Sequence, residues 1–224
     1  MKKRFVIIVA GGSGNRMGSD IPKQFLLING LPVLMHTLLR FKNISAKIFL
    51  VLPQNEIERW NSLMENHVCT IPHTVVVGGK SRFDSVKNGL VHIDENCIVA
   101  VHDGVRPLCS SDLIDRCFEQ AELHSNSIPA MKLTDTIRDI SREKSLTIDR
   151  EKLRIIQTPQ CFDTTLLKEA YANAKAENFT DDAGVFESAG HTIHLVEGEK
   201  NNIKITEPSD LIIASALLKE LSLK

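Results

Sequence analysis

The sequence predicts an α/β protein with a doubly wound, mostly parallel sheet and helices on both of its faces. Two observations lead to this fold class. Short apolar runs alternate with stretches of helical periodicity along the 224 residues. The runs are mostly unbroken, as in strands that are buried on both faces of a parallel sheet. This β-α-β-α order implies right-handed crossovers and a Rossmann-like arrangement, in which ligands bind at the carboxyl ends of the strands.

The apolar runs predict strands at residues 5–10, 47–53, 73–77, 97–102 and 127–131. Apolar residues at helical spacing predict helices between the strands, at 32–41, 54–67, 82–92 and 111–124. After residue 156 we expect helices at 164–177 and 182–189, a last strand at 191–196 and an amphipathic helix at 208–221. That last helix has a proline in its first turn, where the missing N–H costs nothing.

Residues 132–156 interrupt this alternation. Extended character at 132–140 and 146–150 flanks a polar stretch at 141–145, which predicts a β-hairpin inserted into the α/β pattern. The hairpin has little apolar content of its own, so it is either a loose surface excursion or an arm that packs against a second subunit. The length of the chain suits one domain, residues 1–224, with 132–156 as a protruding arm.

Composition excludes several functional classes. The formal net charge is −1, with 42% hydrophobic and 25% charged residues. A charge this close to zero argues against a nucleic-acid-binding protein or one that lies on an anionic membrane. No apolar stretch approaches the length of a membrane span. The five cysteines are scattered and form no C-x-x-C pair, which indicates reduced thiols and a cytoplasmic location.

A glycine-rich loop follows the first predicted strand. It reads A-G-G-S-G-N-R-M-G from Ala10 and is followed by P-K-Q from Pro22. Glycines let backbone N–H groups converge on an anion, while Arg16 and Lys23 add full charges where a polyphosphate would lie. The dinucleotide fingerprint is excluded because Met17 replaces its third glycine, and the Walker pattern does not occur. The loop therefore predicts a nucleotide site of another kind.

Four further motifs fall at or after predicted strand ends: G-G-K-S-R-F-D-S-V from Gly78, V-H-D-G-V-R-P from Val101, Q-T-P-Q from Gln157 and N-I-K-I-T from Asn202. Each one alone has an ordinary explanation, such as a helix cap, an ion pair or a solvated lysine. Asp103 in the second of them suits a clamp on substrate hydroxyls or a ligand of Mg²⁺, which proteins hold with one or two carboxylates plus phosphates.

Taken together and in this order, the motifs resemble those of the IspD family, the 2-C-methyl-D-erythritol 4-phosphate cytidylyltransferases, over almost the whole chain. The resemblance implies a nucleotidyltransferase that converts CTP and methylerythritol phosphate into CDP-methylerythritol and pyrophosphate, with Mg²⁺, in non-mevalonate isoprenoid synthesis. It also implies a homodimer in which the 132–156 arm embraces the second subunit.

Carried over by matching position, the resemblance implies three groups of site residues. The catalytic cations are Arg16, Lys23 and Lys204. The nucleotide-binding residues are Ala10, Gly11, Gly12, Gly14, Gly79 and Ser85. The acceptor-binding residues are Asp103, Arg106 and Thr158, together with Thr136 and Arg150 lent by the arm of the partner, and Asp103 is also the expected metal ligand.

The implied chemistry needs no general base, because a phosphate monoester is already mostly dianionic at neutral pH. Two alternatives stay open: a ribitol 5-phosphate cytidylyltransferase, and a non-catalytic module that binds CTP. The T-I-D-R of the arm and the T-D-D-A from Thr180 favour the methylerythritol enzymes. Asp181 and Asp182 within the latter can either start a helix or serve a site. His191 and His194 would lie on opposite faces of the last strand, which argues against a metal pair.

Overall fold

The apolar runs form one mixed sheet of eight strands in the computed structural model, which describes residues 2–12, 21–44, 46–141 and 143–222. Seven strands follow one another across the sheet, and β12 (Leu195–Glu197) pairs with β7 beside this path. Their order is β10 (Arg154–Ile156), β7 (Asn126–Lys132), β11 (Gln160–Asp163), β6 (Ile98–Asp103), β1 (Arg4–Val9), β4 (Ala46–Leu52) and β5 (Thr74–Val77). Only β10 and β11 run against the other strands, so the predicted mostly parallel sheet is confirmed.

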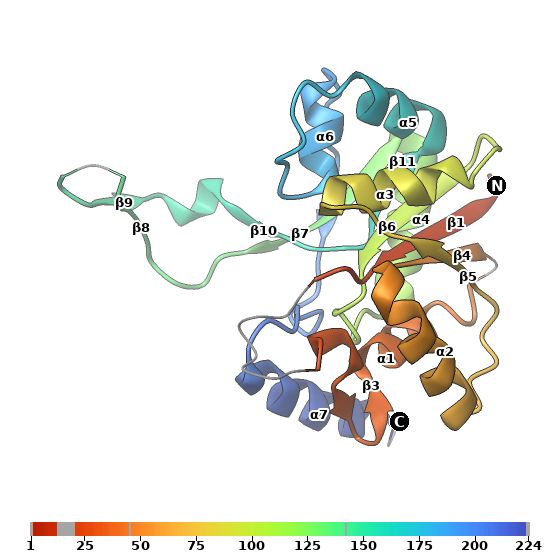
Figure 1. The fold of residues 1–224 in the computed structure, drawn as a ribbon. Helices are drawn as coiled ribbons and strands as arrows, with labels where there is room; N and C mark the ends of the chain where they lie inside the picture. Colours follow the sequence, from red (N-terminus) through yellow and green to blue (C-terminus); the bar gives the residue numbers. More distant parts are fainter. Residues whose placement is uncertain (1, 13–20, 45, 142, 223–224) are drawn as a thin grey trace.

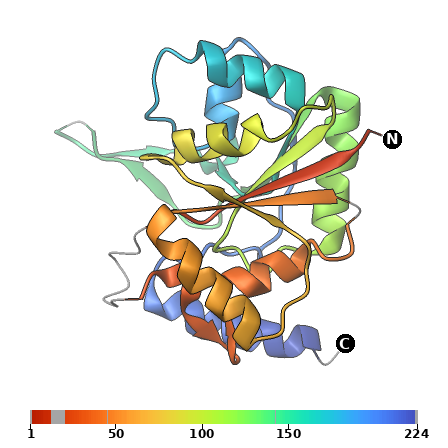
Figure 2. The ribbon, with the colours of Figure 1, turned by 45° about the vertical axis from the view of Figure 1, so that its right-hand side comes forward.

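Helices cover both faces of the sheet, as Figures 1 and 2 show. Side chains alternate across a strand, so Val6 and Ile8 of β1 face one layer while Phe5 and Ile7 face the other. The first layer contains α1 (Val33–Arg40), α2 (Ile57–Asn66) and α4 (Ser111–His124). The second contains α3 (Arg82–Val91), α5 (Thr164–Asn173) and α6 (Asp182–Ser188). The doubly wound architecture expected from the sequence is therefore present.

A smaller third core lies under helix α7 (Pro208–Ser222). There α7 packs on a short hairpin, β2 (Leu27–Ile28) and β3 (Leu31–Pro32), and on the loop that follows β6. The segment before α7 is tied to that loop, because the Ile205 amide donates to the Val105 carbonyl at 2.9 Å. This tie brings Lys204 to the carboxyl end of β6. None of the helices in the described ranges is long and apolar enough to cross a bilayer.

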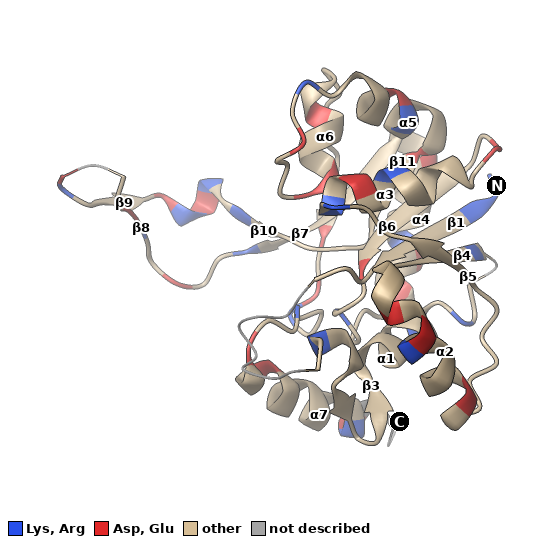
Figure 3. Cartoon of the chain, viewed as in Figure 1, with Lys and Arg blue, Asp and Glu red and all other residues tan. Residues whose placement is uncertain are grey.

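The segment 132–156 projects away from the body of the molecule in Figure 1. Its outer part is a hairpin of β8 (Ile137–Asp139) and β9 (Leu146–Ile148), in which the Arg138 guanidinium donates to Ser145 and Thr147. Its return passes through a 3-10 turn (Arg150–Lys152) and then joins the main sheet as β10, beside β7. Acidic and basic residues both occur along the projection (Figure 3).

The sequence analysis misplaced the start of one strand and missed another strand and a turn. The antiparallel strand β11 was not predicted, because Q-C-F-D has no unbroken apolar run. The last strand begins only at Leu195, so His191 and His194 precede it; their rings stack on those of Phe186 and His124, respectively. The hairpin turn Asn29-Gly30 was also missed, although both residues take positive φ and Asn-Gly is a strong signal for such a turn.

The ends of β1 and β6 approach each other closely at Gly104. The Gly104 amide donates to the Val9 carbonyl at 2.8 Å. A Cβ atom at this position would lie 2.7 Å from the Cβ of Ala10 and 3.1 Å from the Val9 carbonyl oxygen. Glycine is therefore required where the loops after β1 and β6 meet.

Replacement of Gly104 by alanine is expected to destabilise the fold by about 1–3 kcal/mol, because the added methyl group overpacks a contact made partly by backbone. Urea unfolding of the variant measures this loss. Gly12→Ala is the control, since the nearest contact of its Cβ among the described residues would be the Cε of Lys23 at 3.9 Å. Equal stability of Gly104→Ala and wild type would show that the β1 and β6 ends separate easily.

Candidate active site

The carboxyl ends of three central strands lie at one edge of the sheet. Val9 of β1 is in register with Val51 of β4 on one side and with Asp103 of β6 on the other. Val51 is in turn in register with Val76 of β5, so the loops that follow β1, β5 and β6 converge, as expected for a doubly wound sheet. Two cavities of about 240 Å³ each open at this edge.

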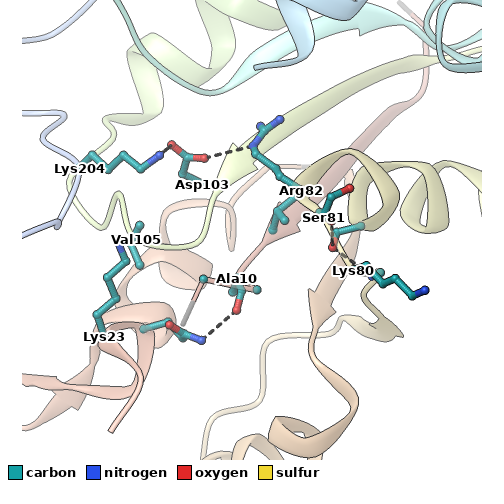
Figure 4. A pocket seen from close by; sticks show the side chains of 14 residues that line it. Ala10, Lys23, Lys80, Ser81, Arg82, Asp103, Val105 and Lys204 are labelled. Carbon is teal, nitrogen blue, oxygen red and sulfur yellow. Dashed lines mark hydrogen bonds and ion pairs between the residues drawn. The ribbon is translucent and has the colours of Figure 1, made fainter. Parts of the chain in front are cut away.

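The first cavity, called here the glycine-loop cavity, lies between the loop after β1 and the start of α3 (Figure 4). Eight of the predicted site residues line it: Ala10, Gly11, Gly12, Lys23, Gly79, Ser85, Asp103 and Lys204. Its loop is held by Gln24, whose buried amide donates to the Ala10 carbonyl at 3.0 Å. Two more predicted residues, Gly14 and Arg16, lie outside the described residues.

The start of α3 forms one wall of the glycine-loop cavity. Ser81 caps the helix in a reciprocal box with Asp84. The Ser85 hydroxyl donates to the Ser81 carbonyl at 2.8 Å and accepts from the Gly79 amide at 3.1 Å. A Cβ atom on Gly79 would lie 2.1 Å from that of Asp84, so only glycine lets the loop pass this close to the helix. The motif thus builds a tight turn that presents backbone groups to the cavity.

Asp103 is the centre of a charged cluster. Lys204 Nζ and Arg106 Nε each lie 3.1 Å from its Oδ2, and Arg82 Nε lies 3.8 Å from its Oδ1. Burial alone would raise the pKa of this carboxyl. The three cations outweigh burial and hold the pKa of Asp103 far below its usual range. Asp103 is therefore ionised at neutral pH and fixes the direction of three cationic side chains.

Thr158 holds the backbone of Asp103 and is itself held by His102. The Asp103 amide donates to the Thr158 hydroxyl at 3.1 Å, and that hydroxyl lies 3.1 Å from His102 Nδ1. Burial lowers the pKa of His102 to about 4, so its imidazole is neutral. His102 Nε2 faces the Arg106 carbonyl at 3.2 Å and must carry the proton, which leaves Nδ1 to accept from Thr158. The Thr158 hydroxyl, predicted to contact substrate, is thus engaged in positioning Asp103.

The second cavity adjoins the first and shares Arg82, Asp103 and Lys204 with it. We call it the acceptor cavity. Figure 4 shows these three side chains in a row, with Lys23 on the side of Lys204 and its nitrogen beside Val105. The remaining residues around the acceptor cavity come from the loop after β6, from the end of β10 through to the start of β11, and from the segment before α6: Arg106, Ile156, Gln157, Thr158, Gln160, Thr180 and Asp181. Any ligands in the two cavities would meet at Asp103 and Lys204.

Sequence reasoning left open whether Asp182 serves a site, and it did not single out Arg82. The two form a bidentate pair, with Arg82 Nη1 and Nη2 at 3.0 and 2.6 Å from the two carboxylate oxygens of Asp182. Burial alone would lower the pKa of Arg82, but Asp182 raises it above its ordinary value. Asp181 has the helix-starting role that the sequence also allowed, because it caps α6 by accepting a hydrogen bond from the Gly184 amide. A pair of residues 100 positions apart leaves no local signal in a sequence.

Thr136 and Arg150 lie on the arm and line neither cavity of their own chain. Arg150 Nη1 donates to the Thr134 carbonyl at 2.5 Å, within the arm itself. Their predicted contribution to a partner's site stays a prediction.

Asp103, the predicted magnesium ligand, has cationic side chains as its neighbours. Among the described residues, no group of three or more His, Cys, Asp or Glu side chains could hold a metal ion. Both oxygens of Asp103 face cations, and Asp103 anchors Lys204. Its role as a magnesium ligand together with substrate phosphates stays a prediction.

The comparisons with known proteins agree with this geometry. The family description IspD, 2-C-methyl-D-erythritol 4-phosphate cytidylyltransferase, matches residues 5–220. The chain belongs to the IspD family. A family member of that name from Bacteroides thetaiotaomicron is 49% identical over 96% of this chain and 100% of its own, and one from Bacteroides fragilis is 48% identical over 96% and 99%.

Solved IspD structures share the fold as well. The 2-C-methyl-D-erythritol 4-phosphate cytidylyltransferase of Thermus thermophilus superposes with a TM-score of 0.81 at 32% identity, covering 97% of this chain and 99% of its own. The Anaerococcus prevotii protein, described as a 4-diphosphocytidyl-2C-methyl-D-erythritolsynthase, gives a TM-score of 0.83 at 30% identity, covering 97% and 96%. The fold predicted from the alternating sequence pattern is thus that of the IspD enzymes.

Stability should fall in mild acid because His102 is neutral in the folded protein. Its pKa is about 4 when folded, against about 6.5 when unfolded. The unfolded chain therefore binds more protons between these values, and His102 withdraws up to about 3 kcal/mol of stability as the pH falls from 6.5 to 4. His36 and His194, whose pKa values burial also lowers, act in the same direction.

Two measurements check this expectation. Denaturant unfolding across the pH range should show a slope that His102→Asn reduces. An NMR titration should find the imidazole signal of His102, identified by its loss in the variant, unchanged between about pH 7 and 5. Titration of that signal near its ordinary pKa of about 6.5 would contradict the neutral, buried assignment.

Proposed function

We propose that the protein transfers a cytidylyl group from CTP to 2-C-methyl-D-erythritol 4-phosphate, giving CDP-methylerythritol and pyrophosphate in non-mevalonate isoprenoid synthesis. The observation that carries this proposal is the Asp103–Lys204 ion pair, which lies in the wall shared by two adjoining cavities. A two-substrate transfer needs such a place, where a fixed cation faces the atoms that react. Membership of the IspD family gives the substrates.

In this proposal CTP occupies the glycine-loop cavity. Its base lies against Gly79 and Ser85, where backbone groups of the turn are accessible, and its triphosphate follows the loop toward Lys23. Ala10, Gly11 and Gly12 line the same cavity beside the proposed path of the triphosphate. Gly14 and Arg16 extend this phosphate site by resemblance to the family.

The methylerythritol phosphate occupies the acceptor cavity with its phosphate toward Lys204. One phosphate oxygen, already deprotonated, attacks the α-phosphorus of CTP, and the bond to the bridging oxygen breaks to release pyrophosphate. Lys204, Lys23 and Arg16 stabilise the negative charge that develops, because fixed cations need no reorganisation during the step. Asp103 holds Lys204 at the junction, and Arg106 and Thr158 hold Asp103.

Magnesium enters this proposal with the nucleotide. Mg²⁺ keeps much of its water shell and is commonly held by substrate phosphates with few protein ligands, so it needs no centre built from side chains. When bound to the triphosphate it supplies charge neutralisation. The roles assigned to Lys23, Lys204 and Asp103 do not depend on it.

The proposed enzyme is a homodimer whose arms cross, so that Thr136 and Arg150 reach the acceptor cavity of the partner. Large apolar side chains on and beside the arm support this, since Ile140 is 80% exposed, Leu146 52% and Ile155 50%. Exposed apolar groups of this size are typical of a surface that packs on another chain. All five cysteines are free thiols, which suits the cytoplasm.

Pyrophosphate release tests the reaction directly. The purified protein is given CTP and Mg²⁺ with either methylerythritol 4-phosphate or ribitol 5-phosphate. Turnover with the first acceptor is expected. Turnover with the second alone would reassign the acceptor, and CTP binding without turnover on either would indicate a non-catalytic nucleotide-binding module.

Lys204→Met is expected to lower kcat by about 10²–10³-fold, the usual effect of removing one preorganised group that stabilises transition-state charge. Binding of CTP should change far less, because Lys204 lies in the wall shared by the two cavities, whereas the proposed base site is at Gly79 and Ser85. Lys200→Met is the matched control, since Lys200 lies in the same segment and lines neither cavity. A Lys204→Met enzyme with normal kcat would remove Lys204 from the transition state.

Mixing two inactive variants tests the crossed arms. In a Lys204→Met/Arg150→Ala heterodimer, one site carries both defects and the other carries neither. Random exchange of subunits should therefore restore about a quarter of wild-type activity. If Arg150 serves its own chain, every site has one defect and the mixture stays inactive.

A further inference from the structure

Arg82 and Asp182 connect the two cavities through the interior of the protein. Arg82 is the first residue of α3, whose start forms a wall of the glycine-loop cavity. Asp182 is the first residue of α6 and directly follows Thr180 and Asp181, which line the acceptor cavity. The bidentate pair between them is the direct polar link between these two helix starts.

The Asp182 end of this link is rigidly held. Asp182 is fully buried, and its Oδ1 accepts a hydrogen bond from the Tyr171 hydroxyl at 2.6 Å. Gln160 fixes the backbone around it, because its side-chain oxygen accepts from the amides of Asp182 and Ala183 at 3.1 and 2.9 Å. The Gln160 amide donates to Asp181 Oδ2 at 2.9 Å. The segment that lines the acceptor cavity therefore moves together with Asp182.

The Arg82 end faces the reacting region. Both terminal nitrogens donate to Asp182, and the third nitrogen, Nε, lies 3.8 Å from Asp103 Oδ1. Asp103 in turn holds Lys204 and lines both cavities. The contacts thus run without a gap from the segment at Thr180 through Asp182 and Arg82 to Asp103 and to the start of α3.

Stability alone does not account for this pair. A buried ion pair is a poor stabiliser, because desolvation of both charges offsets much of their attraction, and an apolar pair would pack as well. The pair joins the starts of two helices, and the third nitrogen of Arg82 lies near Asp103. This placement matches a link between two sites better than an element of the core.

We propose that Asp182 is a positioning residue which, through Arg82, couples occupation of the acceptor cavity to the arrangement of the glycine-loop cavity, so that the two substrates bind cooperatively. This inference rests on the proposed function of the two cavities. Coupling of binding is reciprocal, so the acceptor and the nucleotide tighten each other's binding by the same factor.

Calorimetry with a pair that cannot react measures that factor. The dissociation constant of the α,β-methylene analogue of CTP is determined with and without saturating methylerythritol 4-phosphate. In the wild-type protein the acceptor should tighten binding of the analogue at least about 5-fold, within the usual range of coupling between sites. In Asp182→Asn the ratio should fall to about 1, and the KM for CTP should no longer depend on acceptor concentration.

Two further variants separate coupling from folding. Arg82→Gln combined with Asp182→Asn leaves a neutral pair that can still hydrogen-bond and buries no unpaired charge, so it keeps the test available if Asp182→Asn alone unfolds. Tyr171→Phe is the control, because it removes a hydrogen bond from the same carboxylate and leaves the ion pair intact. The double variant should lose the coupling, and Tyr171→Phe should keep it.

A wild-type ratio of about 1, or a folded double variant that retains the wild-type ratio, would overturn the inference. Equal loss of coupling in Tyr171→Phe would also overturn it, because general loosening would then be the cause. Failure of the proposed function is read separately, from the absence of turnover by the wild-type protein. An active enzyme without coupling contradicts only the inference made here.

Discussion

The arrangement of the site depends on the carboxylate of Asp103 and the three cations around it. One buried negative charge holds Lys204, Arg106 and Arg82 in fixed directions, and each belongs to a different part of the chain: the segment before α7, the loop after β6 and the start of α3. Because Asp103 ends β6, the sheet itself sets the position of these charges. The ion pairs join these three cations to two carboxylates, Asp103 and Asp182, so the paired cluster carries an excess of positive charge and suits a polyanionic ligand.

Much of the fold could be predicted from the sequence. The central strands are unbroken apolar runs, and helices α1 to α4 have apolar residues at helical spacing, so both were found to within a few residues. Strand β11 was missed because its burial comes from neighbours on both sides and not from its own composition, which includes Gln160 and Asp163. Whether such a segment forms a strand depends on the tertiary structure around it.

The candidate site likewise has parts that the sequence predicted and parts that it did not. Motifs after strand ends located Asp103 and Ser85, because the carboxyl ends of parallel strands must share an edge, whereas Lys204 was assigned by resemblance to the IspD family. The parts that were not foreseen are contacts between distant segments, such as the proton on His102 Nε2 and the bond from Thr158 to its other ring nitrogen. Burial determines which group holds a proton, and burial follows from the assembled fold.

Strand β7 has a consequence for how this architecture can be altered. It pairs with β11, with β10 at the root of the arm, and with β12, which leads into the segment that carries Lys204. The arm is therefore not an exchangeable appendage. To graft the arm of another family member onto this chain, a protein engineer would have to transplant β7, β10 and β12 as one block, because a mismatch at the root would also displace the lysine.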